Sequence, residues 1–318
     1  MESSGTFVGI EPARVRRVAC LGAGPIGAGW GAWFLARGYD VTAYVHVASE
    51  EASLRAVIDS AWPSLEALGL ASGASRERLR CTTDLAAAVA DADFVQECVP
   101  EDLALKQGLY ARLDTLVRPE VVIASSTSGL PMTEIQRHCT TPARMVVGHP
   151  FNPPYLLPLV EVVGGAKTDP AAVRWVTEFY RLAGKAPLAL AREVPGFVAT
   201  RLQEALWREA LHMVLNGEAT PEQIDFAVVN GPGPRWAMMG PCLTYHIGGG
   251  EGGMAYCLDQ FGPALKLPWT RLVAPELTPS LRAEMISGAD ALAAGRDYTT
   301  LIEERDRNLI AISKALKG

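Results

Sequence analysis

The sequence lacks the features that mark several classes of protein. Its six cysteines are scattered without a Cys-x-x-Cys pair, and none of its five histidines lies four residues from another. Clustered cysteines would indicate a disulfide framework or a zinc site, so we predict reduced thiols, a cytoplasmic location and no bound metal. Lys and Arg total 29 against 35 acidic residues, a net charge of −6. This leaves no basic excess to neutralise nucleic acid or an anionic membrane.

Targeting and membrane segments are not expected either. Residues 1–14 contain Glu2 and Glu11 and no apolar stretch, unlike a secretory signal. Residues 18–36 carry no charge, as a membrane span would, but five glycines and Pro25 interrupt them. We predict that this stretch forms a strand, a turn and a helix.

The length and composition indicate more than one hydrophobic core. With 318 residues, of which 49% are hydrophobic and 20% charged, the chain exceeds the usual size of a single core. In its first part, short apolar runs typical of buried parallel strands alternate with helical patterns. The strand-like runs are 15–21, 41–45, 94–99, 121–125, 145–148 and 160–163, and the helical patterns include 50–69, 101–116 and 170–183.

The pattern changes near residue 193. Beyond it only helical patterns occur, over 194–216, 221–229, 251–261, 279–293 and 299–317. The sequence therefore predicts an α/β Rossmann-like doubly wound sheet followed by an all-α C-terminal domain. The expected divisions are a flexible tail over 1–14, a dinucleotide-binding domain over 15–192 and a helical domain over 193–318.

A glycine-rich turn follows the first predicted strand. Gly22, Gly24 and Gly27 form a G-x-G-x-x-G pattern, with Pro25 and Ile26 between them at the start of a helix. In this context the first glycine permits a tight turn, the second a close approach to pyrophosphate, and the third close helix–strand packing. The free N–H groups at the helix start favour a phosphate. We predict dinucleotide binding, although a glycine-rich turn without a ligand is the simpler alternative.

The second predicted strand leaves the choice of cofactor open. An acidic residue normally ends this strand and binds the adenosine ribose. Here the strand ends with Val45 and His46, and Asp40 lies at its other end. His46 is a candidate cofactor contact. We expect NAD, with NADP as the alternative because no carboxylate is evident there to repel a 2′-phosphate.

Three polar residues follow or lie within the later strands. Ser128 comes after the run 121–125, His149 after 145–148, and Glu161 lies inside an apolar run. Oxidation of an alcohol needs a base near neutral pKa, a carboxylate to orient it, and a donor to the developing oxygen charge. Each residue alone is more often structural, but their combination after a dinucleotide turn predicts a dehydrogenase.

With these motifs, the chain resembles the 3-hydroxyacyl-CoA dehydrogenase superfamily over residues 15–317. Within it, the helical part is most similar to the branch that acts on free acids such as carnitine and gulonate. The resemblance rests on residues 22–27, 125–129, 149–161, 195–202, 235–241 and 261–270.

The resemblance implies roles for individual residues. It makes His149 and Glu161 the catalytic pair and Ser128 the contact to the substrate hydroxyl. Glu101, Lys106 and Asn152 match positions at the nicotinamide end, and Asn152 also borders the substrate. A helical second domain that dimerises is implied too, so a homodimer is expected.

Two positions depart from the family pattern. Val45 or His46 stands where the family has its ribose-binding Asp, and Thr200 stands where acyl-CoA and gulonate enzymes carry an Asn. Thr is shorter than Asn and lacks its amide, so substrate orientation is expected to differ. Both changes fit a specialised substrate.

The charges favour a small acid over an acyl-CoA. Between 46 and 70 the charged residues are Glu50, Glu51, Asp59 and Glu66 against Arg55, which would repel the phosphates of CoA. Arg235 could bind a substrate carboxylate, although a solvated surface position is as plausible. A trimethylammonium group would favour aromatic rings. The candidates are Trp236, Tyr245, Phe261 and Trp269, although aromatics at helical spacing are usually core residues.

The sequence thus predicts an NAD(P)-dependent 3-hydroxy acid dehydrogenase with a carnitine-like substrate. The alternatives are gulonate, another 3-hydroxy acid or an acyl-CoA as substrate, and a catalytically silent dinucleotide-binding structural protein. The exact acid and the direction of the reaction in the cell stay open.

Overall fold

A computed structural model of the chain describes residues 7–237, 239–249, 251, 253–261, 270, 278–281, 283 and 295–317. The chain forms two compact units, Met1–Thr200 and Arg201–Gly318. The division lies at the start of helix α7 (Ala199–Leu215), past the boundary expected between 192 and 193. Each unit is considered by itself.

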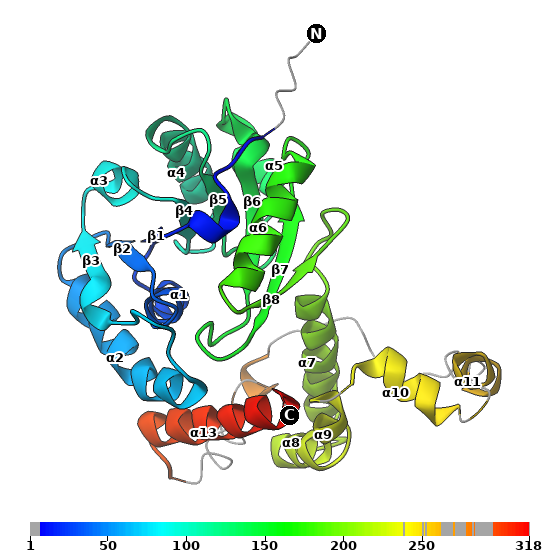
Figure 1. Ribbon diagram of the computed structural model, residues 1–318. Coiled ribbons are helices and arrows are strands. Elements are labelled where there is room, and N and C mark those ends of the chain that lie inside the picture. The colour runs from blue at the N-terminus through cyan, green and yellow to red at the C-terminus, as the bar shows by residue number, and fades with distance from the viewer. Residues whose placement is uncertain are drawn as a thin grey trace. The chain divides into compact units, whose positions relative to one another are not determined.

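The first unit is built on one eight-stranded sheet with the order β3-β2-β1-β4-β5-β6-β7-β8 (Figure 1). The strands are β1 (Arg17–Leu21), β2 (Asp40–Tyr44), β3 (Leu79–Thr82), β4 (Phe94–Glu97), β5 (Val122–Ser125), β6 (Met145–Pro150), β7 (Leu159–Gly164) and β8 (Ala186–Ala189). All neighbours are parallel except β6 and β7. The doubly wound sheet predicted from the alternating pattern is therefore confirmed.

Strands β3 and β8 were not predicted. Both lie at the edges of the sheet, where one side of the strand has no neighbour. Most of their side chains are exposed or half-buried, so neither segment needs the continuous apolar run that marks the central strands. The search for such runs therefore missed them.

Helices cover both faces of the sheet. They are α1 (Pro25–Ala36), α2 (Glu50–Leu68), α3 (Leu85–Val89), α4 (Leu103–Leu116), α5 (Met132–Ile135) and α6 (Pro170–Leu182), with short 3₁₀ turns at Pro12–Arg14, Arg76–Arg78, Gln136–His138 and Pro142–Arg144. On one face Phe34 of α1 and Phe179 of α6 stack with ring centroids 6.0 Å apart, beside Phe94 of β4. On the other, α3, α4 and α5 share a core with the central strands.

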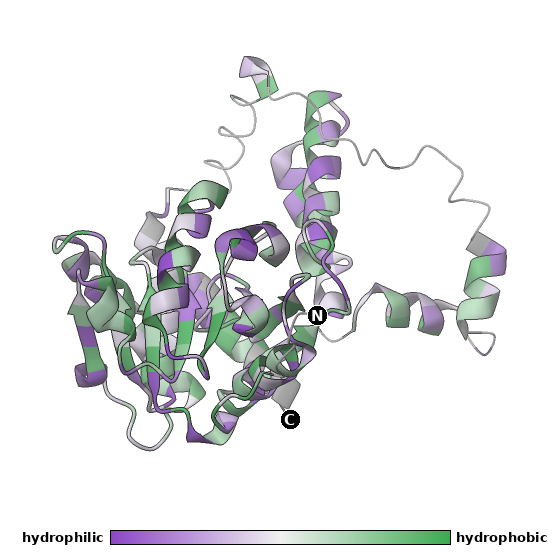
Figure 2. Ribbon diagram, turned by 90° about the horizontal axis from the view of Figure 1, so that it is seen from above, coloured by the Kyte–Doolittle hydropathy of each residue, from purple (hydrophilic) through white to green (hydrophobic). Residues whose placement is uncertain are grey.

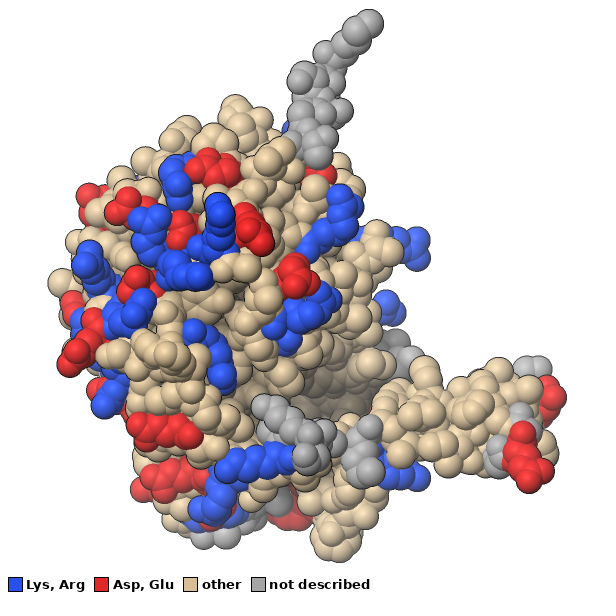
Figure 3. All heavy atoms as spheres, in the orientation of Figure 1, with Lys and Arg blue, Asp and Glu red and all other residues tan. Residues whose placement is uncertain are grey.

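Hydrophobic and charged residues are distributed as expected for a sheet covered by helices. The strands are mainly hydrophobic, whereas the helices carry both hydrophobic and hydrophilic residues (Figure 2). On the face drawn in Figure 3, acidic and basic side chains are interspersed over the first unit. This agrees with a composition in which the two signs are nearly balanced.

Residues 7–14 are held more firmly than the loose tail we expected. The Phe7 N–H donates to Asp169 Oδ2 at 2.7 Å, and the Trp175 indole N–H donates to the Ile10 carbonyl. The segment therefore lies against α6. A sequence without periodicity gave no sign of these hydrogen bonds.

The second unit consists of helices in its described part. These are α7, α8 (Pro221–Asn230), α9 (Gly233–Trp236), α10 (Pro241–Gly248), α11 (Gly253–Phe261) and α13 (Tyr298–Lys317). The expected helix over 279–293 lies largely outside the described residues. Among those described, no helix is long and apolar enough to cross a membrane.

Helix α7 begins later than predicted, at Ala199 instead of 194. Gly196 has a φ of 68° and Phe197 a φ of 51°, both outside the range of a right-handed helix. The backbone therefore makes a turn before the helix starts. This turn brings the first N–H groups of α7 into the candidate site.

Candidate active site

A crevice lies at the carboxyl ends of the parallel strands, where β1 and β4 are neighbours and the strand order reverses direction. Open α/β sheets bind their ligands at such a switch point. The crevice is lined by Gly22, Ala23, Gly24, Pro25, Ile26, Tyr44, His46, Glu50, Cys98, Val99, Pro100, Glu101, Leu105, Leu109, Arg112, Ser126 and Ser128. The turn residues 22–26 and the predicted contacts His46, Glu101 and Ser128 thus lie in one cavity.

The geometry of the glycine turn fits a dinucleotide. Gly22 has a φ of 120°, and a Cβ on it would lie 2.6 Å from the Cys98 carbonyl oxygen. A Cβ on Gly27 would lie 2.1 Å from the Gly22 carbonyl oxygen, so side chains are excluded at both positions. A Cβ on Gly24 would meet nothing within 4 Å, which leaves its backbone open to a ligand. No side chain caps the start of α1, so its N–H groups remain available to phosphate.

The ribose end of the crevice differs from the sequence-based expectation. Val45 is 1% exposed and donates its N–H to the Thr82 carbonyl, so its side chain belongs to the core. His46 lines the crevice, as predicted. A carboxylate is present after all, because Glu50 at the start of α2 also lines the crevice and accepts the His46 N–H at 2.8 Å. Its position in the first turn of the following helix was the overlooked signal.

His149 and Glu161 meet as neighbours on adjacent strands. They are register partners in the antiparallel pair β6–β7, and His149 Nδ1 lies 3.0 Å from Glu161 Oε2. The other carboxylate oxygen accepts the N–H groups of Val198 at 2.9 Å and Ala199 at 2.8 Å. Burial alone would raise the pKa of Glu161, but these hydrogen bonds outweigh it and hold the pKa below its ordinary value. Glu161 is therefore ionised and accepts the Nδ1 proton of His149.

Aromatic rings enclose the imidazole of His149. The ring centroids of Phe151 and Phe197 lie 5.4 Å and 5.6 Å from that of His149. Phe197 is buried and adopts its left-handed conformation directly before the N–H groups that bind Glu161. Phe197 could not be predicted as a site residue, because only this backbone turn places its ring beside His149.

Ser128 and Glu101 are joined at the rim of the crevice. Glu101 Oε1 accepts the N–H of Ser128 at 2.9 Å and the hydroxyl of Thr127 at 2.6 Å. The backbone of Ser128 is thereby held in place, although Ser128 is exposed to solvent. Two residues separated by a strand and a helix in the sequence are thus brought together.

Lys106, predicted at the nicotinamide end, does not line the crevice itself, but its Nζ lies 3.7 Å from Oε2 of Glu101, which does. Its side chain is 1% exposed, and its Nζ lies 2.6 Å from Glu97 Oε1 and 3.1 Å from the Val99 carbonyl oxygen. Glu97 also accepts the hydroxyl of Ser125 at 2.6 Å. Burial raises the pKa of Glu97, and Lys106, Ser125 and Val99 offset part of that rise. The Lys106 amine is thus buried among Glu97, Val99 and Glu101.

The remaining predicted residues have separate locations. Asn152 is exposed and precedes Pro153 in the loop between β6 and β7. Lys185, which is buried, donates to the carbonyls of Pro154 and Leu157 in this loop. Thr200 is half-buried and directly follows Ala199, whose N–H binds Glu161.

Arg235 and Trp236 lie on α9 in the second unit, with exposed side chains. Tyr245 of α10 is also exposed. Trp269 lies outside the described residues, and the side chain of Phe261 is not described either. The proposed aromatic contacts therefore remain predictions.

Family models match both parts of the chain. Residues 17–194 match the NAD-binding domain of 3-hydroxyacyl-CoA dehydrogenase, and residues 196–281 match its C-terminal domain. These matches confirm the resemblance predicted from the motifs.

Several similar proteins have names. An L-carnitine dehydrogenase of Nocardiopsis dassonvillei is 59% identical over 306 residues, covering 96% of this chain and 93% of the relative. One of Pseudomonas putida is 48% identical over 304 residues, covering 96% and 95%. Among solved structures, an NAD⁺-dependent dismutase, 5-formyl-3-hydroxy-2-methylpyridine 4-carboxylic acid 5-dehydrogenase, aligns with a TM-score of 0.80 and 32% identity, covering 96% of this chain and 99% of that one.

Proposed function

Because this chain belongs to the 3-hydroxyacyl-CoA dehydrogenase family, a family of nicotinamide-dependent oxidoreductases, we propose that it oxidises the 3-hydroxyl group of carnitine with NAD. Two L-carnitine dehydrogenases are 59% identical to this chain over nearly their whole length, which supports carnitine as the substrate. Gulonate and acyl-CoA substrates have no comparable support. The acidic segment 46–70 also opposes the phosphates of an acyl-CoA.

The hydrogen-bonded pair of His149 and Glu161 carries the proposal. Glu161 accepts the Nδ1 proton, which leaves Nε2 as the nitrogen that takes the proton of the substrate hydroxyl. The imidazolium that forms is stabilised by the ionised carboxylate, in the manner of the histidine and aspartate of a hydrolase triad. Bound NAD would accept the hydride that leaves the carbon bearing this hydroxyl group.

Ser128 and Asn152 are proposed to orient the substrate. The Ser128 hydroxyl would donate to the substrate oxygen, and its backbone is held for this by Glu101. Asn152 lies three residues after His149 in an exposed loop, where its amide can bind substrate or the nicotinamide. Glu101 is the second proposed contact at that end of the cofactor.

The phosphates of NAD would be held by the glycine turn. The open backbone of Gly24 and the uncapped N–H groups of α1 are suited to the pyrophosphate. Pro25 and Ile26 border the same cavity, and Gly22 and Gly27 allow the tight geometry. Lys106 would contribute indirectly, because its amine lies within 4 Å of Glu97 and Glu101 and so holds the Glu101 carboxylate in place.

The two charged groups of carnitine suggest contacts in the second unit. A carboxylate pairs well with a guanidinium, and a trimethylammonium with aromatic faces. We propose Arg235 for the former and Trp236 for the latter, with Thr200 adjusting substrate orientation in place of an amide. Arg235 and Trp236 are exposed in the described structure and Thr200 is half-buried, which is compatible with these roles.

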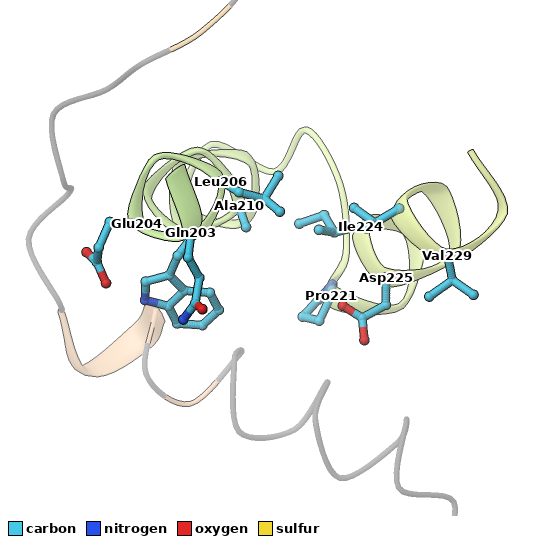
Figure 4. Close-up of a pocket in the computed structure, with 10 residues that line it drawn as sticks. Gln203, Glu204, Leu206, Ala210, Pro221, Ile224, Asp225 and Val229 are labelled. Carbon is cyan, nitrogen blue, oxygen red and sulfur yellow. The ribbon is translucent and has the colours of Figure 1, made fainter. Parts of the chain in front are cut away.

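A homodimer through the helical unit is the proposed assembly. Helices α7 and α8 border an apolar groove, with Leu206, Ala210, Ile224 and Val229 along it (Figure 4). Leu206 is 43% and Val229 66% exposed. Exposed large apolar side chains along one groove are typical of an interface, and a second copy is the partner that the family resemblance implies. Analytical ultracentrifugation tests this, and a monomer at micromolar concentration would exclude it.

The six cysteines are compatible with the proposed cytoplasmic location. All six are free thiols. Reduced cysteines are the rule where glutathione and thioredoxin keep thiols reduced. A fusion imaged in cells would test the location directly.

A substrate panel tests the proposed activity. The purified full chain is supplied with carnitine, gulonate, 3-hydroxybutyrate or its CoA ester, and the absorbance of reduced cofactor is followed. We expect turnover with carnitine and kcat/KM at least about tenfold lower with the others. Dinucleotide binding without turnover of any of these acids would support the silent structural alternative instead.

A further inference from the structure

The adenosine end of the crevice has no acid at the strand terminus, yet it has a carboxylate. Val45, which ends the second strand in sequence, is buried in the core and cannot reach a ligand. Five residues later, Glu50 points back to the strand end, where its Oε2 accepts the N–H of His46 at 2.8 Å. Its side chain lines the same cavity as the glycine turn.

The hydrogen bond from the His46 N–H holds one oxygen of the Glu50 carboxylate and leaves the other oxygen available to a ligand. In the described part of the chain, Oε2 has the His46 N–H as its partner, while Oε1 accepts no hydrogen bond. Glu50 is half-buried, so it faces the cavity without being sealed from it. A carboxylate held in this way is suited to accept hydrogen bonds from sugar hydroxyls.

A cation that lines the same cavity could instead favour NADP. Arg112 of α4 also lines the crevice and is exposed. An arginine in this region would favour the additional phosphate of NADP, whereas a carboxylate would repel it. The two residues therefore make opposite predictions for cofactor preference.

We propose that Glu50 takes over the ribose-binding role of the missing acid: its Oε1 accepts the 2′-hydroxyl of the adenosine ribose, and its charge excludes a 2′-phosphate. This inference rests on the proposed dinucleotide-dependent function and names the residue that selects NAD. Glu50 reaches the ribose from the first turn of α2, so Val45 is free to pack in the core.

The proposed contact has a measurable energy. A hydrogen bond to a charged acceptor contributes enough to change affinity by about tenfold or more. Repulsion between Glu50 and a 2′-phosphate adds to the discrimination, because both carry negative charge in a partly buried cavity. Removing the charge should therefore weaken NADH binding and relieve the exclusion of NADPH.

The experiment measures binding of NADH, NADPH and the 2′-deoxyadenosine form of NADH to the full chain by fluorescence. Glu50→Gln is the test variant, since its amide oxygen can still accept the His46 N–H and keep the loop in place. Glu51→Gln is the matched control, because Glu51 is the next residue but pairs with Arg55 at 2.8 Å. Thermal unfolding verifies that each variant is folded.

We expect wild type and Glu51→Gln to prefer NADH over both other dinucleotides by about tenfold or more. In Glu50→Gln both preferences should fall to within about threefold, through weaker NADH binding and tighter NADPH binding. Unchanged preferences in Glu50→Gln would overturn the proposal. So would a wild type that prefers NADPH, and Arg112→Gln would then show whether Arg112 holds the phosphate.

These binding measurements use no hydroxy acid, so they separate this inference from the proposed reaction. If the chain binds NADH through Glu50 but does not oxidise carnitine, the substrate is wrong and the role of Glu50 stands. If it oxidises carnitine and Glu50→Gln keeps the preference for NADH, the activity stands and the role of Glu50 is wrong. A wild type that binds no dinucleotide overturns both.

Discussion

Two buried charged pairs lie near the carboxyl edge of the sheet, and they differ in what surrounds them. Glu97 and Lys106 are 0% and 1% exposed, and their further partners are Ser125, the backbone of Val99 and, for Lys106, the crevice residue Glu101 at 3.7 Å. His149 and Glu161 are also buried, but the imidazole keeps 8% of its side-chain surface exposed and uses Nδ1 for the carboxylate. The first pair is bonded within the protein, and the second is proposed to leave Nε2 of His149 for the substrate.

The pKa shifts express the same difference. Burial raises the pKa of Glu97, whereas hydrogen bonds from His149 and from the start of α7 lower that of Glu161. Two carboxylates on the same sheet are therefore adapted to different tasks. Glu97 bonds to Lys106 and to the Val99 N–H at the end of β4, and Glu161 has the proposed role of keeping His149 in one tautomer and stabilising its positive charge.

The sharpest test of this comparison is His149→Ala. If His149 is the base, kcat should fall by about 10³-fold or more, because general base catalysis supplies a factor of this size. NADH affinity should stay the same, since His149 does not line the dinucleotide crevice in the described structure. Steady-state kinetics and NADH titration measure both. His138→Ala, an exposed histidine, is the control; comparable rates in the two variants would remove His149 as the base.

The next largest effect is expected for Lys106→Met, and it should appear in stability. Glu97 would be left buried without its cation, which costs about 3–5 kcal/mol in the free energy of unfolding. Denaturant titration measures this, with the exposed Lys167→Met as control. Adding Glu97→Gln should restore part of the loss. A fully stable Lys106→Met variant would show that this pair is not a structural unit.

Glu161→Gln should separate the two roles again. The amide can still accept the N–H groups of Val198 and Ala199, but its NH₂ group would face His149 Nδ1 and favour the wrong tautomer. We expect kcat to fall by about 10²-fold with little change in KM. If Glu161→Gln instead unfolds the protein while keeping the rate of the folded fraction, Glu161 is structural and the comparison fails.

The smallest effect is a difference in pH dependence. The pKa of Glu161 lies below its ordinary 4.5, so its stabilisation is present above 4.5 and is lost as the pH falls through the folded-state pKa. The pKa of Glu97 lies above 4.5, so its contribution is present below 4.5 and is lost as the pH rises through the folded-state pKa.

Thermal unfolding from about pH 7 down to about pH 3 can detect this, because the Glu161 contribution is lost below pH 4.5. On acidification the gap in stability between wild type and Glu161→Gln should narrow, and the gap between wild type and Glu97→Gln should widen. Gaps that change in the same direction would contradict the assigned pKa shifts.

Much of this fold could be predicted because its signals are local. The glycines at 22, 24 and 27, the apolar runs of the central strands and the helical patterns up to 183 are each readable within about twenty residues. The edge strands β3 and β8 were missed because their exposed positions need no apolar run. The start of α7 was misplaced because Phe197 adopts a left-handed backbone that its residue type does not suggest.

The candidate site was predicted less completely, because its geometry depends on distant contacts. Ser128 and His149 are predicted from residue type and from their places after strands, and Glu161 from its place inside an apolar run. Lys106 is predicted at the nicotinamide end, but its amine lies outside the crevice lining and contacts Glu97 and Glu101. The place of Glu50 at the start of a predicted helix can be seen in the sequence, but the hydrogen bond that it accepts from the His46 N–H cannot.

By itself, the sequence determined the class of the fold, the glycine turn and the residue types that alcohol oxidation needs, because hydrophobic periodicity and glycine patterns act over short distances. Only the tertiary structure decided which of the charged groups face the crevice. The antiparallel pairing of β6 and β7 sets His149 opposite Glu161, and the turn before α7 supplies the N–H groups that keep this carboxylate ionised. The charge state and partner of a buried group depend on the residues that packing brings to it from elsewhere in the chain.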